Sequence, residues 1–129
     1  MNLLLDTQAF LYMTECPDRL PSCARAAIED PRNLRLLSVA SPWKLQIKMM
    51  LGKLRLARSV RETVQFDLGR GALRLLPITL DHIDTLAGLP PHHRDPFDRL
   101  LIAQAIHDGL TIVTGDRLIP QYPVPCLWE

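Results

Sequence analysis

The sequence has few of the residues that mark secreted or membrane-bound proteins. Its 129 residues include three cysteines, an odd number without metal-ligand spacing, which argues against a disulfide framework and favours reduced thiols in a cytoplasmic protein. No apolar run approaches the roughly 18 residues of a membrane span, and the first residues lack the basic region of a signal peptide. The net charge is only +1, so the molecule as a whole offers no strong field for nucleic acid.

What the chain does have is enough apolar material for one globular domain spanning residues 1–129, since 47% of its residues are hydrophobic. Its charges are unevenly spread. Between Asp30 and Glu62 there is no acid, but there are eight basic residues: Arg32, Arg35, Lys44, Lys48, Lys53, Arg55, Arg58 and Arg61. This segment forms either a local basic surface or ordinary solvated helix faces.

Apolar runs and helical patterns alternate along the chain. Short apolar runs predict strands over residues 2–5, 34–39, 73–78 and 110–114, with a short edge strand over 126–128. Helical patterns cover residues 7–15, 21–30, 41–51, 59–69, 79–87 and 95–108. Such alternation is typical of an α/β fold, and we expect three α/β/α layers around a parallel sheet of four to five strands.

The helix expected over residues 41–51 contains an unusual lysine. Ser41 is the expected cap, with Pro42 at the first helical position. A spacing of four predicts one apolar face, made by Trp43, Ile47 and Leu51. Lys44 follows Trp43 directly. Considered alone, it is explained as a surface lysine whose aliphatic stem lies along the protein and whose ammonium reaches solvent.

Three acids stand where a parallel sheet gathers its chemistry, outside the carboxyl ends of the strands. Asp6 follows the first strand, Asp116 follows the fourth, and Asp98 lies in the first turn of the long helix. Each alone has an ordinary explanation: a helix cap, a turn with Gly115, and an acid near a helix dipole or in an ion pair. Together they predict oxygen ligands for Mg²⁺ or Mn²⁺, which can activate water for attack on a phosphate.

The loop before the long helix carries further polar residues. Asp95 precedes Pro96 and is expected to cap the helix. His92 and His93 are expected to be exposed loop histidines and not ligands.

Several segments together resemble a known family. They are LLLDTQAFLY, SVASPWKLQIKMMLGKLRL, LPPHHRDPFDRLLIAQA and LTIVTGD. The sequence is similar to PIN-domain proteins, specifically VapC-type toxin ribonucleases of type II toxin–antitoxin systems. The resemblance implies a metal site and catalytic centre of Asp6, Asp98 and Asp116, with Asp95 as a neighbour of the ligands. It also implies that Thr7 and Thr114 orient the acids or a bound water.

The chain departs from the family at Lys44, where a glutamate is expected. A lysine reverses the charge and only donates hydrogen bonds, so it would repel a metal and could pair with Asp6 or Asp98. Three outcomes are open. The acids keep one metal, the ammonium takes the metal's place, or the side chain turns outward and leaves a weakened site.

These observations support three hypotheses. The first is a metal-dependent endoribonuclease that binds RNA phosphates through Lys48, Lys53 and Arg99. The second is a protein with the same fold and little catalysis that binds RNA or an antitoxin, and the third is a nuclease for DNA. The resemblance further implies a VapB-type antitoxin, whose carboxyl-terminal segment covers the acids, and a homodimer formed through helices. If exposed, Leu51, Leu54 and Leu56 could serve it, although core packing is expected for at least two.

Overall fold

A parallel sheet of five strands forms the centre of the molecule. In the computed structural model, which describes residues 1–129, the strand order is β3-β2-β1-β4-β5 and every neighbouring pair is parallel. The strands are β1 (Asn2–Leu5), β2 (Leu34–Ser38), β3 (Arg74–Leu76), β4 (Thr111–Val113) and β5 (Cys126–Leu127). The predicted α/β class and parallel sheet are confirmed, although β3 and β4 are shorter than predicted.

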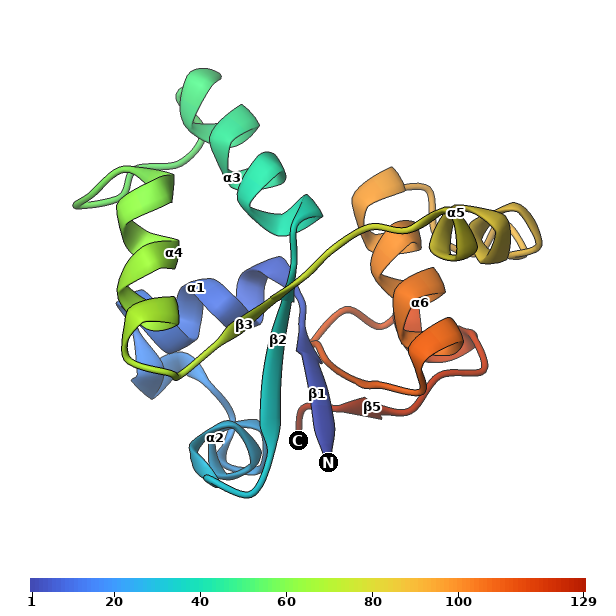
Figure 1. The fold of residues 1–129 in the computed structure, drawn as a ribbon, viewed down its shortest axis with the longest axis horizontal. Helices are drawn as coiled ribbons and strands as arrows, with labels where there is room; N and C mark the ends of the chain where they lie inside the picture. Colours follow the sequence, from blue (N-terminus) through green and yellow to red (C-terminus); the bar gives the residue numbers. More distant parts are fainter.

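Six α-helices cover the sheet. They are α1 (Thr7–Glu15), α2 (Ser22–Glu29), α3 (Ala40–Met50), α4 (Val60–Gly69), α5 (Leu80–Ala87) and α6 (Pro96–Asp108). Short 3₁₀ turns occur at Pro17–Arg19 and Ile119–Gln121. Figure 1 shows α1 to α4 on one side and α5 and α6 on the other. This arrangement confirms the three layers. None of the helices combines the length and the apolar character needed to cross a membrane.

The middle strand, β1, joins the two hydrophobic cores. Leu3 and Leu5 pack into the core that includes α1, α2 and α4, whereas Leu4 packs into the core that includes α6. All three leucines are fully buried, and burying such a side chain stabilises a fold by roughly 1.5–3 kcal/mol. The alternation follows from the period of two in a strand. The carboxyl end of β1 is therefore held from both faces.

The start of α3 differs from the prediction. The helix begins at Ala40, and Val39 occupies the cap position without a side-chain cap. Ser41 lies inside the first turn, where its Oγ accepts a hydrogen bond of 3.0 Å from the hydroxyl of Thr7. Pro42 is still tolerated, because an N–H in the first turn has no partner within the helix. The serine thus links α3 to the start of α1.

The predicted inner face of α3 is also wrong. Leu45 is fully buried, whereas Trp43 is 61% and Leu51 is 63% exposed. Leu54 and Leu56, which follow the helix, pack against the core of α1 and α2. The expectation that at least two of these leucines serve core packing is confirmed.

Candidate active site

The carboxyl ends of β1 and β4 bring two chain segments together. Leu5 is in register with Val113, and the backbone N–H of Asp6 donates to the carbonyl oxygen of Val113 at 3.1 Å. Asp6 and Thr114 therefore leave the sheet side by side. Asp116 lies two residues further along the second segment. Parallel pairing, and not proximity in sequence, joins the first and last predicted acids.

The third acid reaches the same place from α6. Asp98 lies in the first turn of this helix, and it lines a cavity of about 450 Å³ together with Asp6 and Asp116. The remaining lining residues are Thr7, Gln8, Leu11, Tyr12, Lys44, Lys48, Gly115 and Trp128. Three acids from distant segments thus share one solvent-accessible cavity at the sheet edge.

Asp6 is both a helix cap and a member of this acid cluster. Its Oδ1 accepts a hydrogen bond of 2.7 Å from the N–H of Ala9, so the cap interpretation holds. Burial raises the pKa of Asp6 to about 6, and the charges of Asp98 and Asp116 add to this effect, although the hydroxyl of Thr114 and the cap bond oppose it. The buried carboxylate lacks a cation of its own and would gain from one.

Lys44 points into the acid cluster, but its closest partner is Asp95. Its Nζ lies 2.8 Å from Oδ2 of Asp95 and 3.9 Å from Oδ2 of Asp98. Of the three outcomes that the sequence left open, the outward-turned side chain is excluded, because the side chain is only 17% exposed. The expected pairing with Asp98 is present but longer than a hydrogen bond. The structure contains no Lys44–Asp6 ion pair, because the ammonium is held by Asp95.

Asp95 uses its two oxygens for different tasks. Oδ1 caps α6 by accepting from the N–H groups of Phe97 and Asp98, at 2.8 and 3.4 Å, while Oδ2 binds Lys44. Burial would raise the pKa of Asp95, but the hydrogen bonds from Lys44 and Phe97 outweigh it, and the pKa lies below its usual value. The predicted cap is therefore confirmed.

The electrostatics of Asp98 are different. Burial raises its pKa, and the nearby positive charge of Lys44 reduces the rise without cancelling it. The carboxylates of Asp95 and Asp116 add repulsion. Lys44 therefore stabilises the ionised form of Asp95 more than that of Asp98, and the cluster as a whole keeps an excess of negative charge.

His93 is the residue that sequence reasoning placed wrongly. It was expected to be exposed, but it is only 8% exposed. Its Nε2 lies 2.7 Å from Oδ2 of Asp116 and 3.3 Å from Oδ2 of Asp98. Tyr122 fixes the loop, because its hydroxyl accepts from the N–H of His93 and donates to the carbonyl of Pro90. The only sequence signal was its place two residues before the helix cap.

The hydrogen bonds of His93 assign its ring nitrogens. Nδ1 accepts from the backbone N–H of Asp95 at 3.1 Å, so the proton of the neutral ring is on Nε2. An N–H cannot ligate a metal. His93 therefore connects Asp116 and Asp98 as a donor, although its nitrogen and one oxygen of each acid lie within 4.8 Å of one another.

The remaining predicted residues are placed as follows. The hydroxyl of Thr114 lies beside Asp6 and also accepts from the N–H of Asp116 at 3.0 Å, whereas Thr7 bonds to α3. Lys48 lines the cavity but Lys53 does not. Arg99 holds the loop before α6, because its guanidinium donates to the carbonyl oxygens of residues 89, 90 and 93 and to the Tyr122 hydroxyl. Its binding of phosphate stays a prediction.

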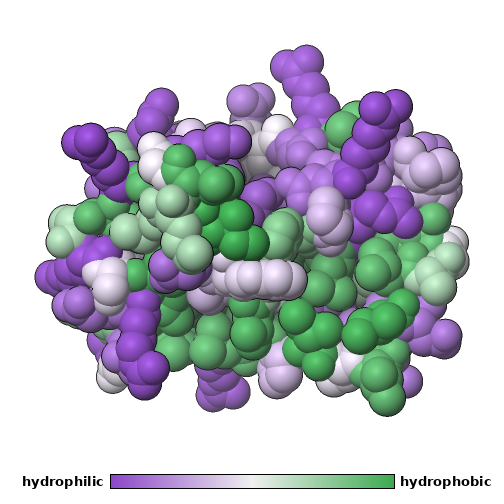
Figure 2. All heavy atoms as spheres, turned by 90° about the horizontal axis from the view of Figure 1, so that it is seen from above, coloured by the Kyte–Doolittle hydropathy of each residue, from purple (hydrophilic) through white to green (hydrophobic).

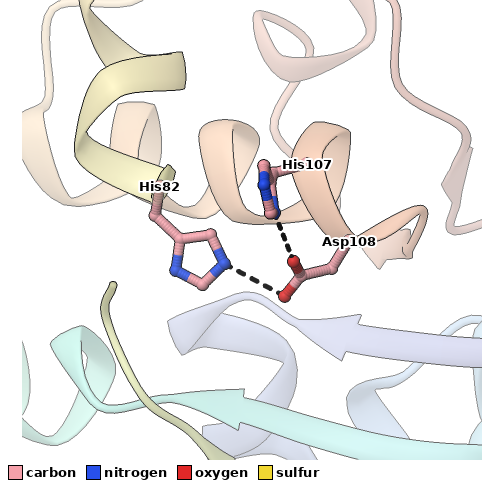
Figure 3. A group of neighbouring side chains, drawn as sticks. All are labelled: His82, His107 and Asp108. Carbon is pink, nitrogen blue, oxygen red and sulfur yellow. Dashed lines mark hydrogen bonds and ion pairs between the residues drawn. The ribbon is translucent and has the colours of Figure 1, made fainter. Parts of the chain in front are cut away.

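A second group of potential metal ligands lies outside this cavity. Figure 3 shows His82 of α5 and His107 of α6 directed at the carboxylate of Asp108, at 3.0 and 2.7 Å. Nδ1 of His82 accepts from the backbone N–H of Thr79, so its Nε2 carries the proton and donates to Asp108. This arrangement fastens α5 to α6 and leaves His82 no lone pair for a metal.

The acid cluster is better suited to a divalent cation. Its donors are carboxylate oxygens, which Mg²⁺ and Mn²⁺ prefer. Asp6 is 7% exposed and Asp98 has a side-chain exposure of 13%, so their charges are poorly hydrated. Burial, with a smaller contribution from the neighbouring carboxylates, raises the pKa of both acids, and a cation in the cavity would stabilise their ionised forms.

Comparison with known proteins identifies the family. The PIN domain model matches residues 3–124. The chain belongs to the PIN-domain family. No curated protein sequence matches this PIN domain.

Solved structures share the fold of this PIN domain. VapBC2 from Rickettsia felis, bound to a DNA fragment from its promoter, gives a TM-score of 0.68 at 15% identity, with 100% of both chains covered. DNA-bound VapBC from Salmonella typhimurium gives a TM-score of 0.67 at 16% identity, with 98% of this chain and 96% of that chain covered. FitAcB from Neisseria gonorrhoeae gives a TM-score of 0.61 at 19% identity, with 96% of this chain and 95% of that chain covered. At these identities the likeness concerns the fold.

Proposed function

We propose that this PIN domain is a metal-dependent endoribonuclease toxin of the VapC type. The observation that carries the proposal is the convergence of Asp6, Asp98 and Asp116 on one cavity at the carboxyl edge of the sheet. The match to the PIN family and the fold shared with VapBC and FitAB complexes support it.

The three acids would hold one Mg²⁺ or Mn²⁺ ion. Such an ion supplies a Lewis acid that activates water and neutralises charge on the phosphate. Asp6 and Asp98 would bind the ion through their carboxylate oxygens. Without a cation, burial disfavours the ionised form of both side chains. Thr114 and His93 would orient the carboxylates, and Lys48 at the cavity wall would attract the RNA backbone.

Lys44 lowers the affinity of this site for the ion. Its ammonium lies 3.9 Å from an Asp98 oxygen, and a unit-charge interaction near 4 Å amounts to about 4 kcal/mol at an effective dielectric of 20, before solvent relaxes around it. Repulsion of a divalent ion is of this order or larger. We therefore expect a nuclease that binds one ion and works below the rate of a site with glutamate at this position.

The nuclease proposal is tested by cleavage of a structured RNA in Mn²⁺, followed at nucleotide resolution. Cleavage is expected in Mn²⁺, and it should stop with EDTA and fall at least 100-fold in Asp6→Asn. His92→Gln is the matched control, because this side chain is exposed and outside the cavity. Cleavage that survives EDTA or Asp6→Asn would eliminate the mechanism. DNA of the same sequence tests whether the substrate is RNA, as proposed.

A second candidate function is binding without useful catalysis. The observation that favours it is the short Lys44–Asp95 ion pair within the acid site. Such a protein would bind RNA or an antitoxin and would not cut. If Lys44→Glu turns an inactive protein into a nuclease, this candidate is preferred, whereas an active parent protein excludes it.

The proposed protein partner is a VapB-type antitoxin in the cytoplasm. The solved relatives are complexes of VapBC and FitAB, and the three cysteines of this chain are unpaired. An antitoxin segment that covers the acids must compete with RNA. Adding the antitoxin should therefore abolish RNA cleavage. Because its segment is proposed to lie on the acid cavity, Asp98→Arg should weaken the complex between the two proteins.

A second copy of this chain is the proposed occupant of its exposed apolar surface. The most exposed large apolar side chains lie on α3 and α5, including Leu80 at 83% and Met50 at 77%. Both helices lie at the upper end of the molecule in Figure 1, and the view of that end in Figure 2 shows hydrophobic side chains gathered over a broad area. Monomers rarely expose large apolar patches. Leu80→Glu should convert a dimer to a monomer in light scattering.

A further inference from the structure

One wall of the acid cavity is aromatic, and the proposed chemistry gives its two side chains no role. Tyr12 of α1 and Trp128, which follows β5, line the cavity together with Asp6 and Asp116. Their ring centroids are 6.4 Å apart and the ring planes are inclined by 33°. Both side chains are half-buried and pack against the core beneath α1. Part of the remaining surface of each ring lines the acid cavity, and Trp128 also borders a second hollow beside Arg117.

Trp128 is fixed beside the acids before any ligand arrives. A Cβ placed on Gly115 would lie 2.8 Å from Cε2 of the indole, so the ring rests directly on the backbone next to Asp116. The carbonyl oxygen of Trp128 accepts from the N–H of Ala24 at 3.0 Å, and the preceding carbonyl, of Leu127, accepts from Thr114. A ring held in this way loses little freedom when a ligand binds, which favours affinity.

Positive charge lies next to the aromatic wall. The guanidinium carbon of Arg19 is 5.2 Å from the centroid of the Tyr12 ring, and the side chain is exposed. Lys48 lines the cavity itself. Acids, two aromatic rings and basic side chains thus follow one another across a short stretch of surface. Aromatic rings beside basic residues are typical of sites that bind single-stranded nucleic acid.

We propose that Trp128 and Tyr12 form a stacking subsite for a nucleobase of single-stranded RNA, next to the phosphate that is cut. This inference rests on the proposed function and names the form of its substrate. Every base has a face that can stack on an indole, whereas bases in a duplex are covered by their neighbours. The cavity volume of about 450 Å³ falls in the roughly 300–1,000 Å³ range of small-ligand sites. The subsite selects unpaired strands.

The fluorescence of Trp128 tests the subsite directly. The chain has two tryptophans, so Trp43→Phe leaves Trp128 as the sole reporter, and adding Asp6→Asn keeps the probe intact. The probes are a single-stranded RNA octamer, its duplex, and an octamer with one run of abasic nucleotides. Saturable quenching is expected with the single strand only. Equal quenching by the abasic octamer would overturn the proposal, because phosphates alone would then explain binding.

Substitutions separate stacking from folding. Affinity is measured by fluorescence anisotropy of labelled single-stranded RNA. Trp128→Phe should keep the affinity within about threefold of the parent. Trp128→Leu should weaken it roughly 5- to 150-fold, which is the range for stacking one base on an aromatic side chain. Gly115→Ala displaces the indole and should weaken binding in the same direction. Phe66→Leu is the matched control, since Phe66 is exposed and lies beside Arg58 and Arg70 on another surface.

The outcomes distinguish this inference from the nuclease proposal. If the parent protein does not cut RNA but quenching still depends on the base, the stacking subsite stands and the nuclease proposal fails. If RNA is cut while Trp128→Leu binds as tightly as the parent, the subsite is refuted and the nuclease stands. An equal loss in Phe66→Leu refutes it as well. Circular dichroism shows whether each variant is folded.

Discussion

Nζ of Lys44 lies 2.8 Å from Oδ2 of Asp95, and the same carboxylate caps α6 through Oδ1. The lysine is therefore bound to the residue that fixes the start of the helix carrying Asp98. Its charge enters the acid cluster through a short ion pair, and its side chain is only 17% exposed. Replacing it changes both the charge of the site and the support of the cap.

We predict that Lys44→Met raises the affinity for Mn²⁺ by roughly 10- to 100-fold, because one positive charge leaves the neighbourhood of the ion. Lys44→Glu should raise it further by adding an oxygen ligand. Without metal, Lys44→Glu should lower the free energy of unfolding by about 1–3 kcal/mol, since it adds a like charge beside Asp95 and Asp98. Titration calorimetry and urea unfolding measure the two effects.

The control for this prediction is Lys48→Met. Lys48 lines the same cavity but forms no ion pair with the acids, so its removal should change Mn²⁺ affinity less than Lys44→Met does. Equal affinities in the parent protein and Lys44→Met would show that the ammonium does not oppose the ion.

We predict that the two bonds of His93 can be separated by two substitutions. A glutamine amide nitrogen can reach the position of Nε2 and donate to Asp116, whereas an asparagine oxygen reaches only the position of Nδ1 and accepts from Asp95. His93→Asn should therefore weaken Mn²⁺ binding about 10-fold or more, since a hydrogen bond to a charged group contributes roughly 1.5–3 kcal/mol. His93→Gln should recover most of it, as measured by calorimetry.

His92→Gln provides the comparison for His93, because the neighbouring ring is exposed and contacts Tyr122 by its edge. It should leave Mn²⁺ affinity unchanged. If His93→Asn binds Mn²⁺ as well as His93→Gln does, the donor to Asp116 has no influence on the site.

We predict that stability of the metal-free protein falls as the pH rises through the titration of Asp6. The folded pKa is raised from 3.8 to about 6, so between these values the folded state binds more protons than the unfolded state, and the free energy of unfolding decreases with pH. The shift corresponds to at most about 3 kcal/mol. This loss of stability is complete above about pH 7, and below about pH 4 no stability has been lost.

Asp6→Asn isolates this contribution, because the amide does not titrate and can still cap α1. Urea unfolding in EDTA at pH 4.5 and 7.5 should show the variant gaining stability relative to the parent at the higher pH. Mn²⁺ should reduce that difference by stabilising the ionised carboxylate. A stability difference that is the same at both pH values would contradict the raised pKa.

We predict that Asp108→Ala destabilises the fold by about 1–3 kcal/mol, because Nε2–H of His82, which is 2% exposed, loses its acceptor. Mn²⁺ affinity and RNA cleavage should not change, since this group lies outside the acid cavity. Asp81→Ala is the control: its side chain is 78% exposed, and it should alter stability by less than about 0.5 kcal/mol. Thermal unfolding distinguishes the two variants.

The strand-end acids could be predicted from sequence because the inference needs only the order of elements and the parallel pairing of strands. The position of Asp6 after β1 and of Asp116 after β4 follows from short apolar runs. Their convergence follows from the rule that parallel strands end at one edge. None of these steps depends on a side-chain rotamer.

The inner face of α3 could not be predicted in the same way. Trp43, Ile47 and Leu51 repeat at a spacing of four, and so do Ser41, Leu45 and Met49. Apolar character favours the first set, yet Leu45 is fully buried, Met49 packs against the core and Ser41 bonds to Thr7 of α1. Periodicity finds a helix but does not choose between two such faces.

The parts of the site that sequence reasoning missed depend on loop conformation. His93 is buried because Tyr122 and Arg99 hold the loop before α6. Trp128 reaches the cavity because β5 pairs with β4 and because Gly115 leaves room for the indole. Contacts of this kind join positions far apart in the chain and leave no local pattern.

The order in which the chain leaves the ribosome determines when its site can exist. β1 is synthesised before its neighbour β4, so Asp6 meets Asp116 only after that later strand has been added. A nascent chain that still lacks residues 114–128 has neither Asp116 nor the indole of Trp128. The acid cavity is therefore complete only once this later segment has been synthesised and has paired with β1.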